Sequence, residues 1–260
     1  MIDSHCHIGI GEEAEKGIPL SETLNRAKNA GISHILTVAC SFDDIDDLKA
    51  MLTFQNVYGA FGIHPENCLN FSREGMFEVF EELPQLIALG EIGLDYFYEP
   101  ETRQKQIHAF ENQIEIADRL NLPIIIHTRD AEDDTISILK SAKNGGLLKK
   151  SGVLHCFTGT QRLADFALDM DLYISASGII TFKNAQSLRD IFQCIPSNRL
   201  LIETDSPYLA PVPYRGKVNE PAYVIETAKC LADIKSLNYT ELEKITTDNF
   251  NHLFIERKNR

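Results

Sequence analysis

Short apolar runs rich in β-branched residues recur along the chain, roughly every 25–35 residues, and a helical pattern follows each run. Such runs are typical of strands that are buried on both faces of a parallel sheet. The predicted strands lie near 1–7, 33–39, 57–63, 86–92, 123–128, 151–156, 171–177 and 199–204.

The segments between these runs have the periodicity of amphipathic helices. The predicted helices lie near 20–30, 43–53, 73–82, 101–120, 131–142, 161–170, 184–194 and 221–235, with a ninth near 240–255. The longest places Ile107, Phe110 and Ile114 on one stripe, and Pro123 then ends it. Eight strands alternating with eight helices predict an α/β fold, a closed (β/α)8 TIM barrel with an extra C-terminal helix packed outside.

Length and composition fit a single domain. The chain has 260 residues, of which 43% are hydrophobic, and no linker or low-complexity stretch divides it. A barrel of this kind needs about 250 residues, so we expect residues 1–260 to form one domain.

The net charge of −13 disfavours non-specific coating of duplex nucleic acid, although a local pocket for one phosphate is compatible with it. The six cysteines are widely spaced and form no C-x-x-C motif, as expected for reduced thiols in the cytoplasm. A strand pattern begins at the first residues, which leaves no room for a signal peptide, and no apolar run suits a membrane helix. We expect a cytoplasmic chain with no membrane partner, and a monomer is compatible with the sequence.

Imidazoles and carboxylates stand at the C-terminal ends of five predicted strands, where a parallel barrel builds its active site. Both are ligands for divalent transition metals. These residues are His5, His7, Glu91, His127, His155, Glu203 and Asp205.

The spacing of these residues predicts two metal ions. His5 and His7 are two apart on a strand and face the same side, as ligands or as buried hydrogen-bonded histidines. Glu91 has two oxygens and can bridge two cations; the alternative is an ion pair with Arg129. Each of the remaining histidines, taken singly, fits a core residue, but their occurrence on consecutive strands favours ligands.

Asp205 is expected to complete the site with His5 and His7, while His127 and His155 form the other site. Two cations ~3.5–4 Å apart can hold a bridging hydroxide, and imidazole ligands favour Zn, Mn or another transition metal, with Mg possible. The sequence contains no G-x-S-x-G and no Walker A motif that would support other chemistry.

Alternatives remain open for four further candidates, which are Glu203, His64, Arg215 and Lys217. Asp205 and Glu91 are the expected catalytic carboxylates, and Glu203 either orients a ligand or water or forms a structural ion pair. His64, in Gly-Ile-His-Pro, either donates to a substrate oxygen or makes a structural hydrogen bond. Arg215 and Lys217, on a proline-rich loop, form an anion clamp or a solvated basic loop.

The same loop ends in Asn219-Glu-Pro221, in which Asn219 is expected to cap the next helix and Pro221 to lie in its first turn.

The motifs together resemble the TatD-type metal-dependent hydrolases. In chain order they are Asp-Ser-His-Cys-His7, Gly-Ile-His-Pro65, Gly-Glu-Ile-Gly-Leu-Asp95, Ile-His-Thr-Arg129, His-Cys-Phe-Thr-Gly159, Glu-Thr-Asp-Ser-Pro-Tyr-Leu-Ala-Pro211 and Arg-Gly-Lys-Val-Asn-Glu-Pro221. The resemblance spans nearly the whole chain and implies an amidohydrolase-like barrel that acts as a divalent-metal deoxyribonuclease. By position it places the family's metal ligands on His5, His7, Glu91, His127, His155 and Asp205.

We therefore expect a hydrolase that cleaves phosphodiester bonds in DNA, in single strands or at ends, through a metal-bridging hydroxide. An ester or amide hydrolase, for example an aminoacyl-tRNA deacylase, would use the same dinuclear site. A non-catalytic binding module on a barrel scaffold is the third possibility.

Overall fold

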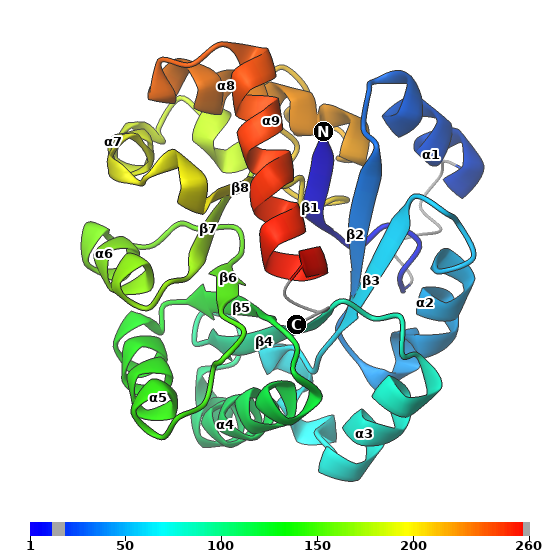
Figure 1. Ribbon diagram of the computed structural model, residues 1–260, viewed down its shortest axis with the longest axis vertical. Coiled ribbons are helices and arrows are strands. Elements are labelled where there is room, and N and C mark those ends of the chain that lie inside the picture. The colour runs from blue at the N-terminus through cyan, green and yellow to red at the C-terminus, as the bar shows by residue number, and fades with distance from the viewer. Residues whose placement is uncertain (12–18, 257–260) are drawn as a thin grey trace.

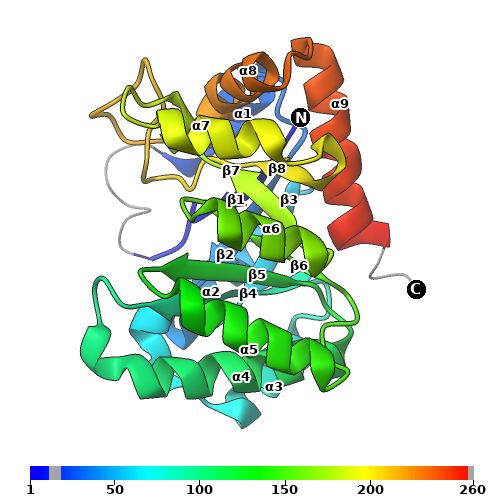
Figure 2. The same ribbon diagram turned by 90° about the vertical axis from the view of Figure 1, so that its left-hand side faces the viewer.

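Eight strands form one parallel sheet in a computed structural model that describes residues 1–11 and 19–256. They pair in chain order from the first to the eighth, with helices arranged around them (Figures 1 and 2). The strands are β1 (Ile2–Cys6), β2 (His34–Ala39), β3 (Val57–Phe61), β4 (Ala88–Asp95), β5 (Ile124–Arg129), β6 (Gly152–Leu154), β7 (Tyr173–Ala176) and β8 (Leu200–Ile202). The predicted (β/α)8 barrel is confirmed.

The helices follow the predicted order, and the first eight lie within two or three residues of the predicted limits, whereas the ninth ends five residues before the predicted 255. They are α1 (Leu20–Asn29), α2 (Ile45–Met51), α3 (Arg73–Glu82), α4 (Arg103–Leu120), α5 (Glu132–Asn144), α6 (Gln161–Asp169), α7 (Gln186–Cys194), α8 (Val224–Lys235) and α9 (Tyr239–Phe250). In α4 the apolar stripe contacts the barrel, with Phe110 and Ile114 fully buried. No helix in the described part of the chain is long and apolar enough to cross a membrane.

Backbone hydrogen bonds join the two ends of the sheet. The amide of Asp205 donates to the carbonyl of His5 at 3.0 Å, and the amide of His7 donates to the carbonyl of Ser206 at 2.7 Å. The chain just beyond β8 therefore lies against the end of β1. This closure brings residues from opposite ends of the sequence to one edge of the barrel mouth.

The C-terminal helix covers the end of the barrel where the strands begin (Figure 1). A π-helical turn, Asn251–Glu256, continues α9, and its Leu253 and Phe254 are fully buried. They belong to one apolar cluster with Tyr173 and Leu201, which stand at the starts of β7 and β8. The opposite end, where the strands finish, is left for the site.

Two strands depart from regular alternation. The pairing register shifts in β1 between Asp3 and Cys6 and in β4 between Leu89 and Ile92. Bulges of this kind re-aim side chains at barrel rims. Each shift lies next to a residue of the predicted metal site.

The predicted cap of the helix after β8 is wrong. Residue Tyr223 precedes α8, and Pro221 opens a separate 3-10 turn. The side-chain amide of Asn219 instead donates to the carbonyls of Thr204 and Tyr208, at 2.7 and 2.6 Å. Asn219 thus fixes the loop that leaves β8, because these carbonyls have no strand partner there.

Candidate metal centre

A cavity of about 970 Å³ at the C-terminal ends of the strands is lined by five of the six predicted metal ligands, His7, Glu91, His127, His155 and Asp205. The sixth, His5, is buried next to Glu91. Strands β6 and β8 are only three residues long, so His155 and Asp205 lie just beyond them. The backbone turns into the left-handed region at Cys156 (φ 42°) and at Asp205 (φ 57°). These turns end the strands at the cavity wall, where strained backbone commonly accompanies functional residues.

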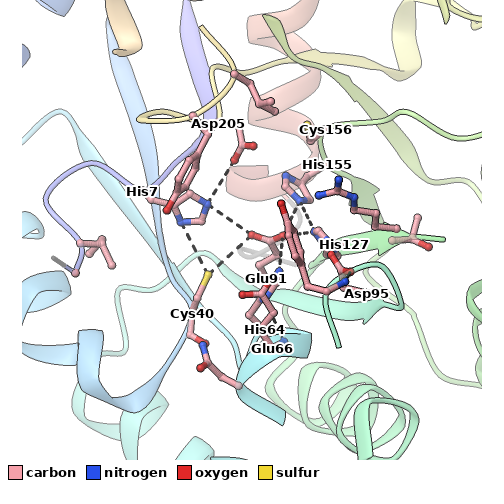
Figure 3. Close-up of a pocket in the computed structure, with 18 of the residues that line it drawn as sticks. His7, Cys40, His64, Glu66, Glu91, Asp95, His127, His155, Cys156 and Asp205 are labelled. Carbon is pink, nitrogen blue, oxygen red and sulfur yellow. Dashed lines mark hydrogen bonds and ion pairs between the residues drawn. The ribbon is translucent and has the colours of Figure 1, made fainter. Parts of the chain in front are cut away.

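One group of donor atoms faces the first oxygen of Glu91. Its Oε2 lies 3.3 Å from His5 Nε2 and 3.7 Å from His7 Nε2. Asp205 Oδ1 lies 3.4 Å from His7 Nε2 and 3.8 Å from His5 Nε2. Two imidazoles and two carboxylates therefore converge, and Figure 3 shows His7 and Asp205 on this side of Glu91.

A second group faces the other oxygen of Glu91. Its Oε1 lies 2.6 Å from His155 Nε2, 2.8 Å from His127 Nδ1 and 3.5 Å from His64 Nε2. Figure 3 shows His127 and His155 on the side of Glu91 away from His7. One carboxylate thus lies between two sets of histidines, which is the arrangement expected of a bridging ligand.

The far nitrogens of His7 and His127 have hydrogen-bond partners, whereas those of His5 and His155 are buried and make no hydrogen bond to a described residue. His7 Nδ1 donates to the carbonyl of Val38 at 3.0 Å, and His127 Nε2 donates to Asp95 Oδ2 at 2.9 Å. His155 Nδ1 lies 3.4 Å from Glu203 Oε1. A proton held on the far nitrogen leaves the near nitrogen's lone pair facing the cavity, as metal ligation requires.

The electrostatics of the cluster follow from burial and mutual contact. Burial alone would raise the pKa of Glu91, but the charge on His155 and hydrogen bonds from His127, His155 and His5 hold that pKa well below its usual range. Burial opposes charge on His155, yet Glu91 and Glu203 raise its pKa well above the usual value. The pKa of His5 is lowered by its burial and by His155.

The donor set fits divalent transition metals. Glu91 is 3% exposed and has no Lys or Arg partner among the described residues; its ion-pair partners there are all imidazoles. The alternative ion pair with Arg129 does not form, since that guanidinium lies over the rings of Phe97 and Tyr98. Imidazole nitrogen with carboxylate oxygen suits Zn, Mn, Fe, Co or Ni better than Mg.

The other predicted residues take different positions. His64 lines the cavity, and Glu203 lies behind His155, where it also accepts from the amide of Cys156 at 2.7 Å. Arg215 and Lys217 are not among the residues that line the cavity. Arg215 donates to the carbonyl of Ala210 at 3.2 Å and lies over the ring of Phe182.

Sequence reasoning missed Asp95, Cys40 and Arg129, which all line the cavity. Asp95 ends the same strand as Glu91, so its position beyond a buried carboxylate was the available signal. Cys40 Sγ lies 3.9 Å from both His7 Nδ1 and Glu91 Oε2. Nothing in the sequence distinguished Cys40 from the other cysteines.

Fold and site together define a class, the metal-dependent hydrolases built on a (β/α)8 barrel. The chain belongs to the TatD related DNase family, whose sequence model matches residues 2–255.

Two bacterial relatives match over nearly their whole length. The chain is 41% identical over 261 residues to the uncharacterized metal-dependent hydrolase YcfH of Escherichia coli K12, covering 98% of this chain and 95% of the relative. It is 37% identical over 257 residues to YabD of Bacillus subtilis, a protein of the same description, with 98% of each chain covered.

A solved structure has the same fold. The crystal structure of YJJV, a TatD homologue from E. coli K12, superposes with a TM-score of 0.89 at 28% identity, covering 97% of each chain.

Proposed function

We propose that this chain is a deoxyribonuclease that hydrolyses phosphodiester bonds of DNA, in single strands or at ends, with two divalent metal ions. The observation that carries the proposal is Glu91, whose two oxygens face separate groups of histidines in an open cavity. Two-metal centres of this kind serve nucleases and phosphatases. The description of the matching family, TatD related DNase, supports DNA as the substrate.

When bound, the ions would lower the pKa of a water molecule and offset the negative charge that develops on the phosphate. His5, His7, Glu91 and Asp205 would hold one ion. Glu91, His127 and His155 would hold the other.

Asp205 is the residue that accepts the proton of the attacking water. Burial would raise the pKa of Asp205, but a hydrogen bond with His7 and the charges on His155, His7 and His5 lower it to about 2. The side chain is therefore ionised at neutral pH and lines the cavity where a substrate enters. An ionised carboxylate is an acceptor only, as this role requires.

His64 donates a hydrogen bond to a phosphate oxygen. The amide of Glu66 donates to His64 Nδ1 at 3.3 Å, so in the neutral ring the proton is on Nε2. That Nε2 lies 3.5 Å from Glu91 Oε1, at the edge of the cluster. A protonated Nε2 cannot ligate a metal, which favours a substrate contact over a further ligand.

Glu203 acts through His155, since its carboxylate lies behind that ring. Arg215 and Lys217 remain predicted DNA contacts, and we place these contacts outside the cavity, on the loop between β8 and α8.

The test is cleavage of labelled single-stranded DNA by metal-loaded protein purified free of other nucleases. We expect cleavage with Zn²⁺ or Mn²⁺ and none above background for Glu91→Gln or His127→Ala, which remove ligands. Equal activity in wild type and both variants would mean a contaminant and would refute the proposal. Intact DNA together with hydrolysis of a carboxylic ester would favour the ester or amide hydrolase.

A further inference from the structure

Arg129 is the cation that the cavity offers to a substrate. Among the described residues that line the cavity it is the sole Lys or Arg, and the acidic residues there are Asp44, Glu66, Glu91, Asp95, Glu99 and Asp205. None of the salt bridges or side-chain hydrogen bonds between described residues uses its guanidinium, which lies over two aromatic rings. Its five N–H donors are thus available to an anion.

Two aromatic rings hold this guanidinium in place. The Cζ atom of Arg129 lies 3.9 Å from the ring centre of Phe97 and 4.7 Å from that of Tyr98. The two rings pack edge to face at 4.9 Å. A guanidinium stacked on aromatic faces keeps its edge donors for a planar, bidentate contact with phosphate.

Hydrogen bonds to Asp95 fix Phe97 and Tyr98 relative to the predicted metal ligands. Asp95 Oδ1 accepts from the amides of Phe97 and Tyr98 at 2.9 and 3.0 Å, while its Oδ2 accepts from His127. Arg129 follows His127 by two residues on β5, so both side chains face the cavity roughly 6.5 Å apart along the strand. The Arg129 guanidinium therefore lies beyond the predicted ligand His127 along β5. From there it would contact a phosphate next to the one being cleaved.

Aromatic rings at the cavity point to a nucleotide rather than a simple anion. Tyr98 lines the cavity and is 57% exposed, so a base can stack on it. On the opposite side, Tyr208 also lines the cavity, with its ring centre 6.2 Å from that of His7. Cations combined with stacking rings are typical of sites for single-stranded nucleic acid.

We propose that Arg129, Phe97 and Tyr98 form a subsite for the nucleotide next to the scissile bond, in which Arg129 binds its phosphate and Tyr98 stacks on its base. This assignment rests on the proposed nuclease function and names the residues that position the strand.

The experiment measures binding of a fluorescent, phosphorothioate-linked oligothymidylate to metal-loaded protein by anisotropy over a range of salt concentrations. Arg129→Gln should weaken binding about tenfold, since a hydrogen-bonded charge is lost. It should also reduce the slope of log affinity against log salt by about 0.7, the value for one phosphate contact on a single strand. Arg129→Lys should keep the slope and lose part of the affinity, and Tyr98→Leu should weaken binding without changing the slope.

Arg103→Gln is the matched control, because Arg103 also lies over a tyrosine, Tyr96, but is paired with Asp134 at 2.7 Å and lies outside the cavity. It should change neither affinity nor slope. An unchanged affinity and slope in Arg129→Gln would overturn the subsite. The subsite would also be overturned if wild type bound inorganic phosphate more tightly than Arg129→Gln did, while both proteins bound the oligonucleotide with equal affinity.

Failure of the proposed function is seen separately with bis(4-nitrophenyl) phosphate, a diester without a neighbouring phosphate. If wild type hydrolyses neither this ester nor DNA, the nuclease assignment fails. The binding comparison still tests whether Arg129 contacts a phosphate of the oligonucleotide. If Arg129→Gln loses bound metal together with hydrolysis of the small ester, Arg129 supports the metal centre and the subsite is refuted.

Discussion

At the scale of single residues, Asp95 links the predicted metal site to Phe97 and Tyr98 of the proposed nucleotide subsite. One of its oxygens accepts from His127 and the other from the amides of Phe97 and Tyr98. Its own backbone amide donates to the buried Gln106 of α4 at 2.8 Å, which holds the end of β4 in place. A substitution of the Asp95 side chain should therefore affect metal affinity more than the stability of the fold.

Asp95→Asn should weaken metal binding about tenfold or more, because an ionised partner raises the basicity of the ligating histidine and fixes its orientation. Competition of the protein with a chelating dye for Zn²⁺ measures the change. Asp248→Asn, which alters an exposed ion pair with Lys244 on α9, is the control and should leave the affinity unchanged. Equal metal affinity in Asp95→Asn and wild type would show that Asp95 only organises its loop.

Metal affinity should rise with pH. Burial opposes charge on His155 and His7, but Glu91 and Glu203 around His155, and Cys40 and Asp205 around His7, raise both pKa values well above the usual 6.5. A ligating imidazole must be neutral, so protons compete with the metal below these raised pKa values and cease to compete above them. Affinity should therefore fall as the pH drops below these raised pKa values, up to about tenfold per pH unit for each proton displaced. A competition titration corrected for the chelator's own protonation measures this slope, and a flat profile would contradict the raised pKa values.

At the scale of elements, β4 and β5 approach closely enough to make a glycine necessary. Gly93 has φ 142°, and a Cβ atom there would lie 2.0 Å from the carbonyl oxygen of His127. The two residues face each other in the β4–β5 pairing. A side chain at this position would push β5 away at the point where it carries a predicted ligand.

Gly93→Ala should therefore lower the free energy of unfolding by about 2–3 kcal/mol, from the unfavourable φ and the backbone clash. Denaturant unfolding in the presence of a chelator measures this without a contribution from bound metal. Gly145→Ala is the matched control, because Gly145 follows α5 at φ −75° and its nearest atoms lie 3.4 Å away. Equal destabilisation by the two substitutions would refute the packing argument.

The same strands show what the sequence could and could not predict. On β5 simple alternation suffices, since Ile125, His127 and Arg129 share one face and the apolar pattern identified the strand. On β1 it does not, because Ile2 and His5 both reach the barrel interior although they are three positions apart, and the register shift in this strand makes this possible. A shift of this kind depends on pairing with β2, which single-strand periodicity does not contain.

The periodicity of the sequence could not predict the contact partners of Arg129 either. Its stacking on Phe97 and Tyr98 depends on a turn that Asp95 holds, and so on contacts across β4 and β5. The sequence placed Arg129 correctly at a strand end and offered only Glu91 as its partner. Ligand candidates were easier to find, because their chemistry marks them at strand ends whatever their exact contacts are.

At the scale of the whole molecule, the metal cluster joins distant parts of the chain. Its donors come from β1, β4 and β5 and from the ends of β6 and β8, so bound metal would join the first and last strands of the sheet. Helix α9 covers the other end with apolar contacts that do not involve the site. The barrel thus has one apolar end, closed by α9, and one polar end that carries the predicted metal ligands.

Metal removal should consequently lower stability without abolishing the fold. A ligand that binds only the folded state stabilises it by RT ln(1 + [L]/Kd), about 2.7 kcal/mol for free metal at a hundredfold excess over Kd. We expect Zn²⁺ or Mn²⁺ to raise the denaturant midpoint by an amount that grows with metal concentration, and a chelator to reverse it. Glu91→Gln should lose most of this metal-dependent increase, because the carboxylate between the two groups of histidines is gone. Asp248→Asn should keep all of it, and a wild-type midpoint that is indifferent to metal would show that the cluster does not bind these ions in the folded state.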